Sequence, residues 1–183
     1  EISDIIASSG RLLRYSMKCN KQYVLLEEEI EYVKDYIILM NARYYSKIRL
    51  IIDVEDRLMK AEVFKMLLQP VVENAVLHGI QSKGGDGVIS IKAAVVEDDM
   101  LIITVQDDGI GMNKEKLDKL KETIEFNQGE NVSYKRENGL GLKNINERIR
   151  LFYGNKYGLD ICSEENKYTK VTLKLKYRRE MGW

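Results

Sequence analysis

Residues 68–80 read LQPVVENAVLHGI, a segment that joins a helical apolar pattern to polar residues that packing alone does not require. Its apolar side chains recur at helical spacing and can form a buried face: Val72, Ala75 and Val76. Asn74 and His78 are one helical turn apart, with Glu73 close beside them. Because asparagine is a poor helix former, Asn74 indicates a need for its amide, for instance on a metal-bound phosphate. An exposed polar face is the plainer interpretation of this segment taken alone.

A second segment, VQDDGIGM at 105–112, follows a strand pattern. Asp107 and Asp108 come directly before Gly109 and Gly111, which form a tight turn where backbone can approach a ligand. A carboxylate at the end of a strand can accept a hydrogen bond from an exocyclic amine such as that of adenine. An ordinary Asp-Gly turn is the alternative interpretation.

The third segment, NGLGL at 138–142, comes directly before a helical pattern. Glycines at that place open the start of a helix, whose free N–H groups suit phosphate. The segment lacks the third glycine of a dinucleotide-binding fingerprint, and the chain has no G-x-x-x-x-G-K-[ST] loop. Two common nucleotide-binding folds are thereby disfavoured.

The periodicity of apolar residues predicts the order of elements along the chain. We expect helices at 2–18, 27–46, 62–79, 113–122 and 140–153, the last ended by Gly154, and strands at 48–54, 88–96, 100–105, 159–162 and 171–175. Strands grouped in hairpins among helices predict an α+β fold, with a mixed sheet covered by helices on one face.

The predicted helix at 27–46 carries an apolar stripe with alternating steps of three and four residues. The stripe consists of Ile30, Val33, Ile37, Met40 and Tyr44. This spacing is typical of a seam in a helical bundle, so we favour a helical hairpin over 1–46 that dimerises. The alternative is two ordinary helices packed on the chain's own core.

Composition excludes several functions. The 29 basic and 29 acidic side chains give a net charge of zero, which argues against a nucleic-acid partner. A single histidine rules out a multi-histidine metal cage within this chain. Apolar runs are too short to predict a membrane span. The first residue is Glu1 rather than Met, so we expect the chain to be part of a longer protein.

Taken together and in this order, the three segments resemble the N, G1 and G2 boxes of the GHKL ATP-binding superfamily. The wording LQPVVENAVLHGI, DDGIGM and GLGLKNINERIRLFYG is similar to that of the YesM/LytS-like subclass of bacterial sensor histidine kinases. The resemblance implies a two-layer α/β sandwich with a mixed, mainly antiparallel sheet. It also implies a partial dimerisation segment at 1–46, a catalytic ATP-binding domain at 47–183 and an ATP lid at 113–138.

The resemblance implies a role for each box residue. Asn74 would hold Mg²⁺ against the phosphates of ATP, Glu73 beside it would act as catalytic base or orienting group, and Asp107 would read the adenine amine. Other residues would contact the nucleotide: His78, Gly109, Gly111, Met112, Gly139, Leu140, Gly141, Leu142 and Lys143.

Two departures from the subclass stand out. Leu77 occupies a position where many relatives have Lys or Arg near phosphate, and Lys143, Lys135 or Arg136 remain alternatives for that charge. A Pro-His-Phe segment, which carries the acceptor histidine in this subclass, is absent from the chain. We therefore expect the acceptor histidine upstream of Glu1.

The resemblance implies transfer of the γ-phosphate of ATP to that upstream histidine and then to an aspartate of a response regulator. It also implies a homodimer and a cytoplasmic position in a cell-membrane protein anchored by upstream segments. The chain by itself is expected to bind ATP and not to phosphorylate itself. Alternatives are a GHKL ATPase or anti-sigma-type serine kinase, and an interaction module that has lost ATP binding.

Overall fold

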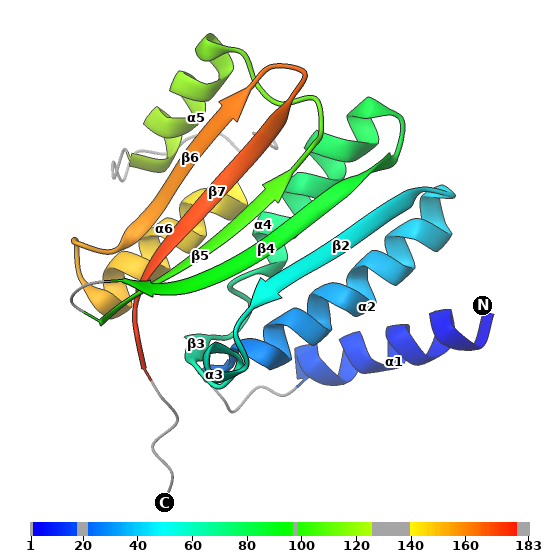
Figure 1. The fold of residues 1–183 in the computed structure, drawn as a ribbon, viewed down its shortest axis with the longest axis horizontal. Helices are drawn as coiled ribbons and strands as arrows, with labels where there is room; N and C mark the ends of the chain where they lie inside the picture. The colour runs from blue at the N-terminus through cyan, green and yellow to red at the C-terminus, as the bar shows by residue number, and fades with distance from the viewer. Residues whose placement is uncertain (1, 18–21, 97–98, 126–139, 179–183) are drawn as a thin grey trace, which may run out of the picture.

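A five-stranded sheet is the centre of the structure, a computed structural model that describes residues 2–17, 22–96, 99–125 and 140–178 (Figure 1). The strand order is β2-β4-β5-β7-β6. The bounds are β2 Lys47–Val54, β4 Asp86–Val96, β5 Met100–Asp107, β6 Gly158–Glu164 and β7 Tyr168–Lys176. Only β2 and β4 pair in parallel, and the other neighbours are antiparallel. The five strands expected from alternation are confirmed.

One face of this sheet is apolar and the other polar, as the period of two along each strand requires. Buried side chains on the covered face are Ile89, Ile91, Leu101, Ile103, Val105, Val171, Leu173 and Leu175. On the opposite face, Lys92 Nζ lies 2.8 Å from Asp53 Oδ2 in an exposed ion pair across β4 and β2. The sheet can therefore carry helices on one side only.

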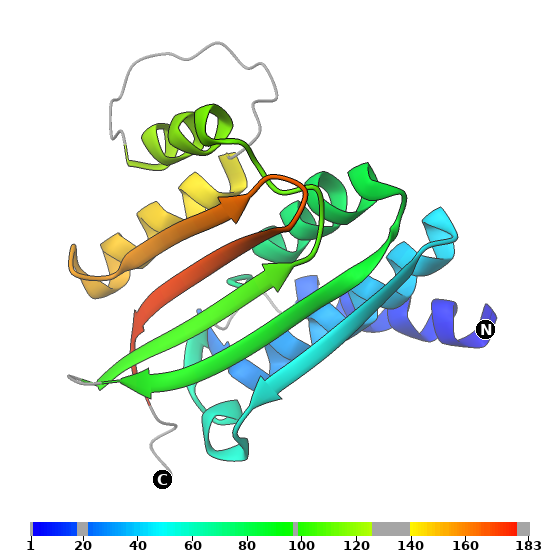
Figure 2. The same cartoon turned by 45° about the horizontal axis from the view of Figure 1, so that its top comes forward.

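Three helices cover the apolar face: α2 (Leu26–Tyr44), α4 (Gln69–Asn74) and α6 (Leu140–Tyr153) (Figures 1 and 2). Helix α4 continues into a π-helical segment, η1 (Ala75–Ile80), and a short 3₁₀ turn, η2 (Gln81–Lys83). Helix α6 ends where expected, because Gly154 takes φ 96° and its N–H donates to Arg150 O at 2.9 Å. The observed layers confirm an α+β sandwich.

The apolar stripe of α2 packs inside the chain. Ile30, Val33 and Ile37 are at most 5% exposed and belong to the core that also holds Ile48 of β2. The alternative interpretation, packing on the chain's own core, is therefore the right one for this stripe. Amphipathic spacing shows that a face is buried but does not show what covers it.

Helix α1 (Ile2–Met17) lies against α2 and away from the sheet (Figure 1). Ser8 is its one residue that is fully buried. Its large apolar side chains are mostly exposed: Ile2 76%, Ile6 67%, Leu13 61% and Met17 69%. The unpartnered apolar face of the helical pair is thus on α1.

The helix expected at 62–79 was wrong at its start. Residues Glu62–Phe64 form strand β3, which pairs antiparallel with β1 (Tyr23–Leu25) in a separate two-stranded sheet. A turn follows, and the helix begins only at Gln69, with Pro70 in its first turn. The strand and the turn both bury apolar side chains, and the spacing of these side chains along the sequence also fits a helix. Strand β1 and helix α3 (Asp56–Met59) were not predicted, because three and four residues are too few to show a periodic apolar pattern.

The expected lid at 113–138 is described only in its first half. Helix α5 (Lys114–Glu125) confirms the short helix and runs three residues further. The remainder of the expected lid, with Lys135 and Arg136, lies outside the described residues, as does Gly139. In the described part of the chain, no helix combines the length and apolar character that crossing a membrane requires.

Candidate functional site

A cavity of about 700 Å³ opens beside the end of β5, a size typical of small-molecule sites. Helix α4 with η1, the loop after β5, helix α5, the start of α6 and strands β6 and β7 contribute its walls. Expected site residues in the lining are Asn74, His78, Asp107, Gly111, Met112 and Leu142. The structure thus brings residues from all three sequence segments to one cavity.

Asp107, the last residue of β5, supplies the buried polar group of the cavity. It is 3% exposed, and its Oδ1 accepts a hydrogen bond of 2.9 Å from the N–H of Gly109. Burial raises the pKa of Asp107 to about 7, although the Gly109 hydrogen bond works in the opposite direction. A desolvated carboxyl group that lines a cavity is suited to accept a hydrogen bond from a ligand N–H.

Two glycines leave room for this carboxyl group because they have no side chains. A Cβ on Gly79 would lie 2.4 Å from Asp107 Oδ1, and a Cβ on Gly109 would lie 2.3 Å from the carbonyl carbon of Gly79. The N–H of Ile110 also donates to Gly79 O at 3.2 Å. Gly109 therefore packs behind the cavity against η1 and does not line it, whereas Gly111 does.

The loop after β5 is fastened to the hairpin of β6 and β7. Gly111 has φ 59°, and a Cβ there would collide with Glu164 O. The N–H of Met112 donates to Ser163 Oγ at 2.9 Å, and the N–H of Asn166 donates to Ile110 O at 2.6 Å. These contacts hold the cavity wall in place before any ligand binds.

Helix α4 presents Asn74 to the cavity. Asn74 Nδ2 donates to Pro70 O at 2.6 Å, which leaves the amide oxygen Oδ1 without a hydrogen-bond donor among the described residues. The first turn of α6 packs closely against α4: a Cβ added at Gly141 would lie 3.4 Å from Pro70 Cβ. Leu142, 3% exposed, closes the same corner.

Five expected site residues do not line the cavity within the described structure. Glu73 accepts a hydrogen bond of 2.7 Å from Gln69 Nε2, and its charge adds to the burial that raises the pKa of Tyr32 on α2 to about 12. Glu73 therefore faces α2, although it is adjacent to Asn74 in sequence. The others are Gly109, already placed behind the cavity, Leu140, which is 48% exposed, Gly141, which packs against Pro70, and Lys143, whose Nζ lies 4.0 Å from Glu147 Oε1.

Several cavity residues were not predicted from the sequence, and the two cations among them are Lys116 and Lys119 of α5. The backbone of Lys116 helps to start the helix, because its N–H donates to Asn113 Oδ1 at 3.0 Å. Lys119 Nζ lies 2.7 Å from Glu115 Oε1 in an exposed pair. Their three-residue spacing directly after the loop is a signal that could have identified them.

The donor set fits a metal ion carried by phosphate rather than one held by protein alone. No cluster of three or more His, Cys, Asp or Glu side chains occurs among the described residues. Mg²⁺ keeps several waters and takes one or two protein oxygens together with substrate phosphates. The free Oδ1 of Asn74 meets that requirement.

The family model for histidine kinase-, DNA gyrase B- and HSP90-like ATPases matches residues 60–179, and the chain belongs to this family. A second model, described as histidine kinase, matches residues 1–48. Sensor histidine kinase YesM of Bacillus subtilis (strain 168) is 31% identical over 181 residues, which are 99% of this chain and 29% of that protein. Sensor protein kinase HptS of Staphylococcus aureus (strain USA300) is 28% identical over 175 residues, 96% of this chain and 32% of that protein. The chain spans less than a third of either relative.

Solved structures show the same fold. The histidine kinase domain of the blue-light activated kinase from Erythrobacter litoralis (EL346) gives a TM-score of 0.53 at 16% identity, over 95% of this chain and 73% of that one. Mycobacterial sensor histidine kinase MprB gives 0.56 at 16% identity, over 86% of this chain and 97% of that one. The fold class expected from the sequence is confirmed.

Proposed function

We propose that the chain is the ATP-binding catalytic portion of a sensor histidine kinase, with Mg²⁺-ATP bound in the cavity beside Asp107. The supporting observation is the buried carboxyl group of Asp107 in the cavity wall, with the free amide oxygen of Asn74 in another part of the same wall. Adenine would donate its exocyclic amine to Asp107. The phosphates would then extend past Asn74 toward the start of α6 and the lysines of α5.

In this proposal the protein acts mainly by positioning and by charge. Mg²⁺, held by Asn74, neutralises phosphate charge when it is bound. Lys116 and Lys119 would add positive charge, and backbone N–H groups in the first turn of α6, where Leu142 lines the cavity, would add donors. Glu73, which faces α2, would orient or deprotonate an imidazole that arrives at that side of α4.

The acceptor histidine would lie outside this chain. His78 lines the nucleotide cavity, so we assign it to ATP binding, and the chain by itself should bind ATP without phosphorylating itself. From the acceptor the phosphoryl group would pass to an aspartate of a response regulator. Anchoring to a membrane would come from other segments of the full protein.

The domain boundary belongs at residues 18–22 rather than at 46/47 in this proposal. Helix α2 supplies core residues to the sheet, whereas α1 supplies none. Homodimerisation would use the exposed apolar face of α1, consisting of Ile2, Ile6, Leu13 and Met17.

Titration with a fluorescent ATP analogue tests the adenine-reading role. The variant Asp107→Asn should bind about 10- to 150-fold more weakly, because one charge-assisted hydrogen bond of roughly 1.5–3 kcal/mol is lost. Asp108→Asn is the matched control: Asp108 accepts from the N–H of Val88 at 2.9 Å and does not line the cavity. Equal affinities for Asp107→Asn and the unaltered protein would refute the role.

A further inference from the structure

Glu29, in the first turn of α2, is a carboxylate that is 1% exposed and has no part in the proposed chemistry. Its Oε1 accepts a hydrogen bond of 2.7 Å from the N–H of Met66, and its Oε2 accepts one of 2.9 Å from the N–H of Leu68. The hydroxyl of Tyr15 on α1 donates to Oε1 as well. Burial raises the pKa of Glu29, and these three donors oppose that effect.

The two backbone donors come from the turn that leads into the nucleotide site. Met66 takes φ 60°, a left-handed conformation that is unusual for a residue with a side chain. Leu67 and Leu68 are fully buried, and Leu68 is the residue from which α4 starts. Asn74 lies six residues further along that helix. The position of Asn74 therefore depends on a turn whose N–H groups are held by Glu29.

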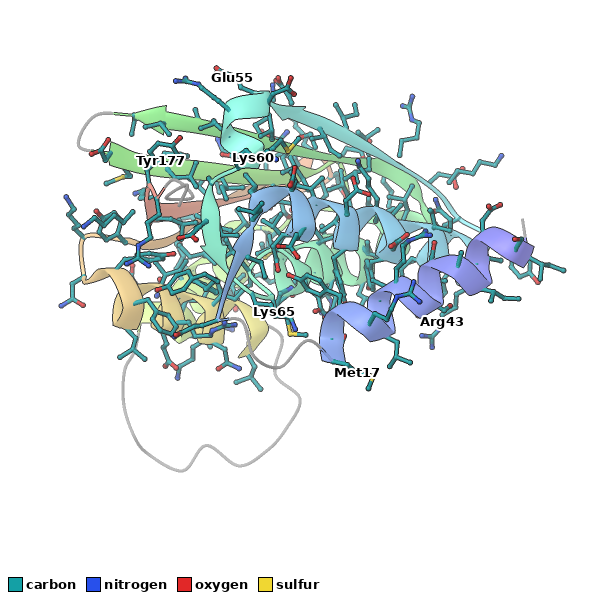
Figure 3. All side chains as sticks on the ribbon, turned by 90° about the horizontal axis from the view of Figure 1, so that it is seen from below. Met17, Arg43, Glu55, Lys60, Lys65 and Tyr177 are labelled. Atoms are coloured by element: carbon teal, nitrogen blue, oxygen red, sulfur yellow. The ribbon has the colours of Figure 1, made fainter. Side chains whose placement is uncertain are left out.

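Helix α1 reaches this turn through polar contacts. Tyr15 packs on Tyr32 with ring centroids 5.0 Å apart, and Lys65 Nζ lies 4.9 Å from the Tyr15 ring centroid. Lys65 Nζ also donates to Ser16 O at 3.4 Å, and Figure 3 shows Lys65 near Met17 at the end of α1.

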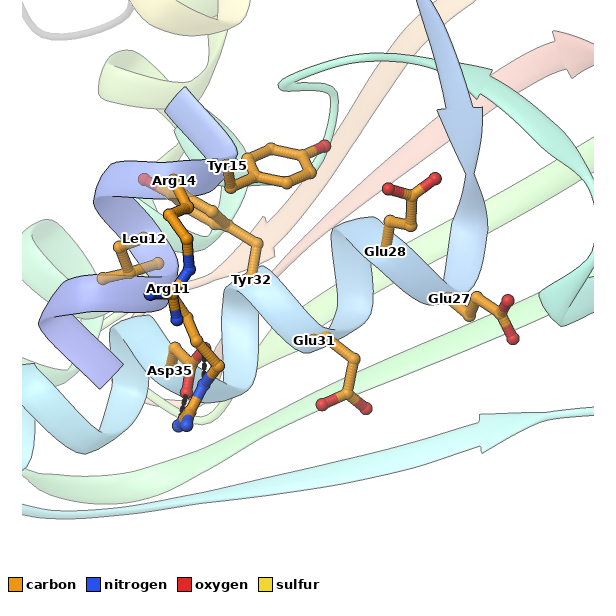
Figure 4. A pocket seen from close by; sticks show the side chains of 9 residues that line it. All are labelled: Arg11, Leu12, Arg14, Tyr15, Glu27, Glu28, Glu31, Tyr32 and Asp35. Carbon is orange, nitrogen blue, oxygen red and sulfur yellow. Dashed lines mark hydrogen bonds and ion pairs between the residues drawn. The ribbon is translucent and has the colours of Figure 1, made fainter. Parts of the chain in front are cut away.

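A second polar anchor holds α1 to α2. Arg11 Nε donates to Asp35 Oδ2 at 2.7 Å and Arg11 Nη2 to Asp35 Oδ1 at 2.5 Å, the paired contact drawn in Figure 4. Arg11 Nη2 also donates to Ser8 Oγ at 3.0 Å. A cavity of about 470 Å³ remains between the helices along these residues. Helix α1 is thus fixed by a few directional contacts and not by a filled apolar interface.

We propose that Glu29 is a positioning residue of the nucleotide site, because its carboxylate fixes the turn at residues 66–68. Tyr15 of α1 donates to the same carboxylate, so the position of this turn depends on the position of α1. When α1 is docked, three donors fix the carboxylate, and the carboxylate fixes the turn before α4. Movement of α1 would remove the Tyr15 hydroxyl, loosen the turn and shift Asn74 relative to the phosphates. This inference rests on the proposed ATP site, and it gives the route by which α1 acts on that site.

The variant Tyr15→Phe tests the proposal, because it removes one hydroxyl from a part-buried position. The dissociation constant of the fluorescent ATP analogue should rise about 2- to 10-fold, the worth of one hydrogen bond. The amide hydrogens of Met66 and Leu68 should exchange faster with solvent, while those of β5 keep their rates. Tyr45→Phe is the matched control, since Tyr45 is 95% exposed. Glu29→Gln should weaken binding more than Tyr15→Phe, because its NH₂ group would face a backbone donor.

Four results would overturn the proposal. A lower melting temperature for Tyr15→Phe with unchanged nucleotide affinity would make the contact merely structural. Unchanged exchange at Met66 and Leu68 would do the same, even if Glu29→Gln failed to fold. An unaltered protein that bound no analogue would refute the ATP site along with this inference. If instead Asp107→Asn weakened binding and Tyr15→Phe did not, the ATP site would stand and only the role of Glu29 and Tyr15 would fall.

Discussion

Asp107, the residue that we propose to read adenine, lowers the stability of its own fold. Its carboxyl group is 3% exposed and receives one hydrogen bond from within the protein, from Gly109. Ionisation in that position is unfavourable, which is the physical cause of the pKa of about 7. A bound amine that donates to the carboxylate would lower this cost of ionisation. The fold thus keeps an unfavourable buried carboxyl group at a position where it can recognise a ligand.

Replacing this residue should therefore stabilise the empty protein. The pKa of Asp107 is raised from 3.8 to about 7, so between these pH values the folded state holds a proton that the unfolded state has released. Stability is thus lost as pH rises toward 7, and the loss is complete above it. Asp107→Asn carries no charge and should gain up to about 4 kcal/mol over the unaltered protein at pH 8, and less at pH 5.

Thermal unfolding without nucleotide at the two pH values measures this gap. Asp118→Asn, at an exposed position of α5, serves as control here, and its melting temperature should follow that of the unaltered protein. A gap of equal size at pH 5 and pH 8 would show that the charge of Asp107 is not its cause.

Helices α4 and α5 both line the side of the cavity where we propose that the phosphates of ATP bind. Helix α4 contributes the amide of Asn74, fixed by its own hydrogen bond to Pro70 O. Helix α5 contributes Lys116 and Lys119, whose side chains are exposed and can adapt to the ligand. Helix α5 therefore supplies the described cations that could stand in for the missing positive charge at Leu77.

Removing those cations should weaken ATP binding moderately. The double variant Lys116→Gln, Lys119→Gln should bind the ATP analogue about 2- to 10-fold more weakly, because exposed charge pairs contribute little each. The loss should shrink as salt rises, since exposed charges are screened. Lys121→Gln, on the same helix and outside the cavity lining, is the control. A loss that persisted undiminished in high salt would contradict an electrostatic role.

The whole molecule is a nucleotide-binding sandwich with one helix on its outside. Helix α1 touches the remainder mainly through Tyr15 and Arg11, and its large apolar side chains face outward. Monomeric proteins seldom expose an apolar row of this kind. The fold thus combines a self-contained ATP domain with a helix that still requires a partner, which we propose to be a second copy.

Interrupting that apolar row should dissociate the dimer without unfolding the chain. Leu13 is 61% exposed, so Leu13→Glu should change the free energy of unfolding of a single chain by less than about 0.5 kcal/mol. Sedimentation should show a dimer for the unaltered protein and a monomer for this variant. Leu151→Glu, at an 80% exposed leucine of α6, should remain dimeric. Identical sedimentation of all three proteins would rule out α1 as the interface.

Local patterns determined the sheet strands and the boundaries of α2 and α6, because period and helix-ending glycines are properties of neighbouring residues. Tertiary structure decided which element each buried face packs against and which side chains meet at the cavity. Residues 62–64 form a strand because they pair with β1, and the apolar stripe of α2 packs on the sheet instead of on a second helix.

The placement of side chains at the cavity also depended on tertiary structure. Glu73 faces α2 while Asn74 faces the cavity, and the polar helix α5 brings Lys116 and Lys119 to the cavity. Glu29 is one of three acids in the first turn of α2, and only its contacts with Tyr15, Met66 and Leu68 distinguish it. An amphipathic sequence fixes which face of an element is buried, but the partner of that face is chosen by packing between residues far apart in the chain.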